Sequence, residues 1–116
     1  MTDPKPINRG AVILEPTDEY LRWAKNAPDP MPDLTLATLQ DEARVYLMPQ
    51  FDFDGDSEAW LESNYLPMFE EELQSWCTDE DSWPEDLSYE SFRKFFNVHI
   101  TSLIFDLGQG PFHHED

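Results

Sequence analysis

The longest helical pattern of this chain runs from Ser57 to Cys77, and it limits the folds that the rest of the chain can adopt. Bulky apolar residues recur in it at steps of four, four, four and three, a spacing that keeps them on one face of an α-helix. They are Leu61, Tyr65, Phe69, Leu73 and Trp76. Pro67 interrupts the pattern, and inside a continuous helix it would cost about 3 kcal/mol. We therefore expect one helix over about Ser57–Asn64 and a second with Pro67 in its first turn, ending near Trp76, with a single helix kinked at Pro67 as the alternative.

Three apolar runs predict β-strands, and shorter helical patterns separate them. The strands are expected over residues 10–14, 44–48 and 98–107, and the further helices over residues 18–26, 36–42 and 89–96. Because helices separate all consecutive strands, the order β-α-α-β-α-α-α-β favours an α/β fold with a small three-stranded, mostly parallel sheet. Apolar residues on both faces indicate an interior first strand and a central last strand. An antiparallel edge strand or an α+β fold is the alternative.

The length of 116 residues fits one domain, over residues 10–110, between an N-terminal tail (1–9) and a C-terminal tail (111–116). The 8 Phe, 4 Trp and 4 Tyr supply enough apolar surface for a core. A single cysteine excludes an internal disulfide and fits a reducing compartment. The N-terminus is polar, and no apolar run reaches the ~18–20 residues of a membrane span. We expect a cytoplasmic protein.

The charge of the chain is strongly one-sided. Its formal net charge is −18, from 7 basic and 25 acidic residues, which opposes binding to nucleic acid and to anionic membranes. No lysine or arginine lies between Arg44 and Arg93. This stretch is either a solvated face or a docking surface for a basic protein partner. The candidate partner-binding residues are Asp52, Asp54, Asp56, Glu58, Glu62, Glu70 and Glu71, with Trp60 and Trp83 as aromatic anchors.

Three alternating aspartates suggest a second kind of site. Asp52, Asp54 and Asp56 match the acidic ligands at positions 1, 3 and 5 of an EF-hand calcium loop. Ser57 and Ser63 stand where that loop needs a glycine and a bidentate glutamate. A turn with acidic capping of the next helix explains the same residues more simply. The alternative function is therefore a divalent-metal-binding domain or a small metal-dependent enzyme that uses these three aspartates.

Other enzymatic signatures in the chain are weak, and we expect neither catalysis nor a cofactor. Asp52–Gly55 resembles the Asp-x-Asp-Gly-Thr motif of the haloacid dehalogenase superfamily, but Asp56 replaces the threonine. His99 lies inside the last predicted strand, and His113 and His114 are adjacent in the C-terminal tail, where neither has a positioned third ligand. No glycine-rich phosphate loop is present.

Four short motifs carry a family resemblance. They are Tyr46–Pro49, Phe69–Leu73, Trp83–Pro84 and Phe105–Leu107. With them the chain looks like a group of small, acidic, uncharacterised bacterial proteins, a resemblance that implies no activity. The order of elements is also similar to that of barstar, an acidic ribonuclease inhibitor with three parallel strands, as an analogy of fold alone. Together with the charge, this favours a non-enzymatic binding module, namely an inhibitor, an immunity-like factor or an adaptor.

Overall fold

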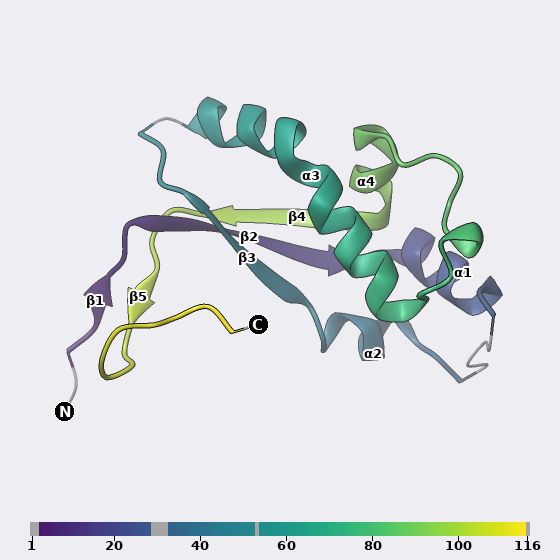
Figure 1. Ribbon diagram of the computed structural model, residues 1–116, viewed down its shortest axis with the longest axis horizontal. Coiled ribbons are helices and arrows are strands. Elements are labelled where there is room, and N and C mark those ends of the chain that lie inside the picture. Colours follow the sequence, from purple (N-terminus) through teal and green to yellow (C-terminus); the bar gives the residue numbers. More distant parts are fainter. Residues whose placement is uncertain (1–2, 29–32, 53, 116) are drawn as a thin grey trace.

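The computed structural model describes residues 3–28, 33–52 and 54–115 (Figure 1). The elements are β1 (Lys5–Pro6), β2 (Arg9–Pro16), α1 (Asp18–Asn26), α2 (Leu36–Gln40), β3 (Arg44–Pro49), α3 (Asp54–Trp76), the 3-10 helix η1 (Glu80–Ser82), α4 (Tyr89–Phe95), β4 (Phe96–Thr101) and β5 (Phe105–Asp106). They form a three-stranded sheet in the order β3-β2-β4 and a two-stranded sheet of β1 and β5. All pairings are antiparallel, so the fold is α+β.

The predicted mostly parallel sheet is therefore wrong, and the connections give the reason. Two short helices, α1 and α2, follow β2 and bring the chain back to the end of the sheet that it had left, so β3 runs antiparallel to β2. Both β3 and β4 are antiparallel to β2 and flank it, so they run in the same direction without pairing with each other. Helices between strands allow crossovers to parallel neighbours but do not require them. The element order consequently no longer implies the sheet of barstar.

The strand positions confirm one expectation and overturn another. The first predicted strand lies within β2, which is the central strand of the larger sheet, as expected. The last predicted strand is not central, because β4 is an edge strand that ends at Thr101, and the chain then leaves this sheet to form β5. Three apolar residues of that predicted strand are largely exposed, with 73% for Leu103, 55% for Phe105 and 58% for Leu107. The residues expected to form the N-terminal tail contribute β1 and the start of β2.

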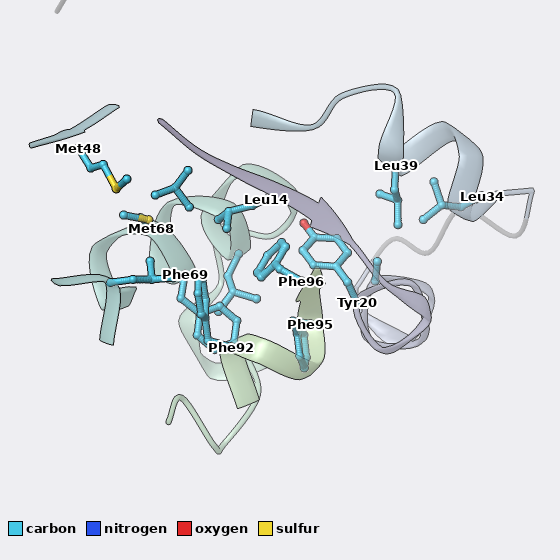
Figure 2. Packing of buried hydrophobic residues seen from close by; sticks show 14 residues of the cluster. Leu14, Tyr20, Leu34, Leu39, Met48, Met68, Phe69, Phe92, Phe95 and Phe96 are labelled. Atoms are coloured by element: carbon cyan, nitrogen blue, oxygen red, sulfur yellow. The ribbon is translucent and has the colours of Figure 1, made fainter. Parts of the chain in front are cut away.

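The core lies between one face of the larger sheet and the helices α1, α3 and α4 (Figure 2). Val12 and Leu14 project into it from β2, which follows from the alternation of side chains along a strand. Phe69 of α3 meets Phe92 of α4 and Phe96 of β4, with ring centroids 5.6 and 6.0 Å apart. All five side chains are at most 1% exposed. Of the predicted apolar stripe, Leu61, Phe69 and Leu73 belong to this core, and Tyr65 and Trp76 pack against it.

Helix α3 continues through Pro67 as one helix of 23 residues, so the expected break is wrong. The buried stripe extends on both sides of the proline, with Leu61 before it and Phe69 and Leu73 after it, all at 0% exposure. Burial of three such side chains contributes on the order of 1.5–3 kcal/mol each, which exceeds the ~3 kcal/mol cost of the proline. Pro67 itself is exposed, so the backbone carbonyl that loses its donor can bind water.

Candidate protein-binding surface

A row of side chains follows the solvent side of α3. Glu58, Glu62, Leu66 and Glu70 are spaced by four residues, so they lie one above another along the helix. We call these four residues the α3 ridge. The first three are exposed, with Leu66 at 40%, and Glu70 is half-buried. The packing of the opposite side of α3 into the core holds the ridge outward.

The ridge carries negative charge that the structure only partly neutralises. Arg93 of α4 lies 3.3 Å from Glu58, and both side chains are substantially exposed, so this ion pair contributes at most about 1 kcal/mol. Glu62 and Glu70 form no ion pair within the described residues. The exposed Leu66 is therefore flanked along the helix by two unpaired carboxylates.

The other acidic candidates lie around the ridge. Glu71 faces β3, where its carboxylate lies 3.6 Å from the guanidinium of Arg44. Asp52 precedes α3, and Asp56 lies in its first turn; both are exposed. The side chain of Asp54 falls outside the described residues. The exposed candidates thus extend the acidic surface from the ridge to the N-terminal end of α3 and toward β3.

The two tryptophan candidates are half-buried and are tied to the body of the protein. Trp60 packs against Phe51, with ring centroids 6.4 Å apart. The indole N–H of Trp83 donates to the backbone carbonyl of Cys77 at 2.8 Å. Leu66 is the more exposed apolar side chain on the acidic surface. Sequence reasoning overlooked it, although a helical projection places it among the glutamates and off the apolar stripe.

A metal site finds no support in the described geometry. Over residues 3–28, 33–52 and 54–115, no three His, Cys, Asp or Glu side chains come together in a way that could hold a metal ion. Asp52 and Asp56 therefore lack a third acidic partner there, while the side chain of the predicted ligand Asp54 lies outside that description. No observation favours the metal-dependent alternative.

One acidic residue of the same stretch is not on the surface. Glu72 is 7% exposed, and its Oε1 accepts a hydrogen bond from the Tyr46 hydroxyl at 3.2 Å. The Tyr20 hydroxyl donates to the backbone carbonyl of Glu72 at 3.1 Å. Burial raises the pKa of the Glu72 carboxyl, although Arg44 and the Tyr46 hydroxyl act in the opposite direction. Burial likewise raises the pKa of both tyrosines. Glu72 belongs to the interior and not to the candidate surface.

Glu72→Gln is expected to change the pH dependence of stability. Because the pKa of Glu72 is higher in the folded than in the unfolded protein, its contribution to stability is complete below pH about 4.5 and is lost as pH rises through the folded pKa. The free energy of unfolding of Glu72→Gln, relative to the natural protein, should therefore increase with pH above about 4.5. Urea denaturation at a series of pH values measures this difference.

Glu62→Gln is the matched control for that series, since it removes one carboxylate from an exposed position on the same helix. If the two variants show the same pH dependence, the burial of Glu72 is not its cause. A difference that decreases with pH for Glu72→Gln would mean that the charge of Arg44 and the hydrogen bond from Tyr46 together outweigh desolvation.

Comparison with known proteins finds no matching protein-family model, no matching curated protein and no matching solved structure. Among the described helices, none is long and apolar enough to cross a membrane. A function for this surface must therefore be inferred from its own geometry and charge.

Proposed function

We propose that this protein is a non-enzymatic binding module that engages a basic protein partner through the α3 ridge. The observation that carries the proposal is Leu66, an exposed leucine held between the unpaired carboxylates of Glu62 and Glu70 on a helix packed into the core. Protein interfaces commonly combine a central apolar contact with a polar rim. An inhibitor, an immunity-like factor and an adaptor all fit this description.

The negative charge of the ridge, and of the whole protein, favours a positively charged partner. A net charge of −18 on 116 residues attracts positively charged surfaces over several ångströms and raises the rate at which they associate. The same charge repels nucleic acid and anionic lipid. Lysine or arginine side chains beside a small apolar contact are therefore the chemistry that the ridge would recognise.

Pro67 adds a polar feature to the same surface. Since proline has no backbone N–H, the carbonyl of Ser63 one turn earlier receives no hydrogen bond from it. Ser63 and Pro67 are both exposed and lie beside Leu66 on the helix. This carbonyl is an acceptor for a lysine or arginine donor of a partner.

Glu62→Gln combined with Glu70→Gln is expected to reduce partner binding by about tenfold or more, because both unpaired carboxylates beside Leu66 are lost. The measurement is a pull-down of the tagged full chain from its native lysate, washed at about 50 mM and then about 500 mM salt. We expect a basic protein that the natural chain retains at low salt and releases at high salt.

A second double variant, Glu80→Gln with Asp81→Asn, removes the same number of charges from η1, away from the ridge. It should still capture the same protein. Equal loss from both double variants would show that net charge, and not the ridge, is recognised. A partner retained undiminished at high salt would contradict the electrostatic mechanism.

A further inference from the structure

On the face of the larger sheet opposite the core, the apolar side chains of the edge strand β3 are exposed, whereas Ala11 of the central strand is 3% exposed and Ile13 is half-buried. Side chains alternate along strands, so Ala11 and Ile13 of β2 share this face with Val45 and Leu47 of β3. Ile13 pairs with Val45, and Ala11 pairs with Leu47. Val45 is 59% exposed and Leu47 is 47% exposed, so within the described chain this edge of the face has little cover. We call it the open sheet face.

The open sheet face is nearly neutral in a strongly acidic protein. By the same alternation, its ionisable residues on β2 are Arg9 and Glu15, whose formal charges cancel. On β4 it carries His99, whose Nε2 lies 4.0 Å from Glu15. The acidic α3 ridge lies beyond the core, on the other side of the sheet. Two copies of this chain would therefore repel each other least if they met through their open sheet faces.

The two-stranded sheet is the second unusual feature. We call residues 3–8 and 102–112 the arm, because β1 and β5 project away from the body of the protein (Figure 1). Four apolar side chains of the arm are largely exposed, with 73% for Leu103, 55% for Phe105, 58% for Leu107 and 59% for Phe112. Six of the seven large hydrophobic side chains exposed in the described residues lie on the arm or on the open sheet face; the other is Leu66.

The arm has little support within one chain. Its two strands have two residues each, joined further by a hydrogen bond from the Ile7 N–H to the Ile104 carbonyl at 3.0 Å. An isolated two-stranded sheet is marginally stable at best in water. The radius of gyration is 16.1 Å, whereas a compact domain of this length would have about 13 Å. An extended arm with exposed apolar side chains, together with the exposed Val45 and Leu47 at the edge of the sheet, indicates that both surfaces need a partner.

We propose that two copies of this chain form a twofold dimer in which the arm of each copy covers the open sheet face of the other. A sheet of three strands and about six residues offers only about 300 Å² on one face. A stable interface needs about 800 Å² on each partner, so the sheet face alone is too small. Reciprocal exchange supplies the difference, because each copy contributes a face and an arm. Both acidic ridges remain outside.

The test is sedimentation velocity of the full chain from about 1 µM to about 200 µM, at about 0.1 M and about 0.5 M salt. We expect a monomer–dimer equilibrium that tightens with salt, since screening weakens the repulsion between two acidic chains. Leu47→Glu and Phe105→Glu should each weaken the dimer by about tenfold or more, as each places a charge in the apolar contact.

Leu66→Glu is the matched control, because it makes the same change at an exposed leucine on the opposite side of the protein. Leu66→Glu should leave the dimer intact and weaken capture of a basic partner. Leu47→Glu should weaken the dimer and leave capture of a basic partner unchanged. The two proposals can therefore fail separately. Near-ultraviolet circular dichroism checks that each variant is folded. If Leu47→Glu does not fold, the dimer is tested with Phe105→Glu alone.

A monomer at every concentration would overturn the dimer. So would a dimer that folded Phe105→Glu leaves unchanged, or one that Leu66→Glu weakens as much as Leu47→Glu does. A dimer that dissociates as salt rises would place the contact among charged groups and not on the neutral face.

Discussion

Replacing Phe69 by alanine is expected to lower the free energy of unfolding by about 3–5 kcal/mol. Phe69 is 0% exposed and lies at the centre of the core, with ring centroids 5.6 Å from Phe92, 5.4 Å from Phe95 and 6.0 Å from Phe96. The substitution removes the contact between α3 and three rings at once and leaves a cavity. For a domain whose total stability is about 5–15 kcal/mol, this approaches complete unfolding.

Urea denaturation followed by tryptophan fluorescence measures the loss. Leu66→Ala is the control on the same helix, and its 40% exposure leads us to expect a change of less than about 1 kcal/mol. Similar losses from the two variants would show that α3 is not held by the buried stripe. A loss below about 1 kcal/mol for Phe69→Ala would contradict the packing described above.

Pro67→Ala is expected to have the opposite sign and to raise the free energy of unfolding by about 2 kcal/mol. Alanine restores the hydrogen bond to the Ser63 carbonyl and removes the clash with the preceding turn, a difference of about 3 kcal/mol inside a helix. The greater freedom of the unfolded alanine chain returns about 0.4–1 kcal/mol of that gain. Because Pro67 is exposed, no core contact is lost.

Thermal and urea denaturation of Pro67→Ala measure the gain, with Ser63→Ala as the control for helix propensity at the exposed position one turn earlier. A stability equal to or below that of the natural protein would mean that the proline ring makes stabilising contacts of its own. If Pro67→Ala is more stable but captures less of a basic partner, the proline serves the binding surface at the expense of stability.

Local signals predicted several elements well. The helix expected over residues 18–26 corresponds to α1, and those expected over 36–42 and 89–96 correspond to α2 and α4 within two residues. The Thr35 and Ser88 side chains accept hydrogen bonds from the backbone N–H groups of Thr38 and Ser91, so they begin their helices as N-caps. Thr17 differs, since its hydroxyl donates to the Lys94 carbonyl and does not cap α1.

The candidate surface was predictable only in part. A helical projection places Glu70 and Glu71 outside the stripe that contains Phe69. It places Glu72 on that stripe, three residues after Phe69, but it does not reveal the partner of its carboxylate, because Tyr46 of β3 is 26 positions away. The partial burial of Trp60 and Trp83 depends in the same way on chain segments that pack over them.

The sequence by itself determined the positions of α1, α2, β3 and α4, that α3 has an apolar and an acidic side, and that the charge is extreme. These properties depend on residues close together in the chain. Only the tertiary structure decided the direction of the strands, since helical connections of similar length can return the chain to either end of a sheet. It also decided the continuity of α3 through Pro67, where burial against distant elements outweighs a local preference. The exposure of Phe105 and Leu107 followed from the departure of the chain from the larger sheet after Thr101, which alternation within a strand does not encode.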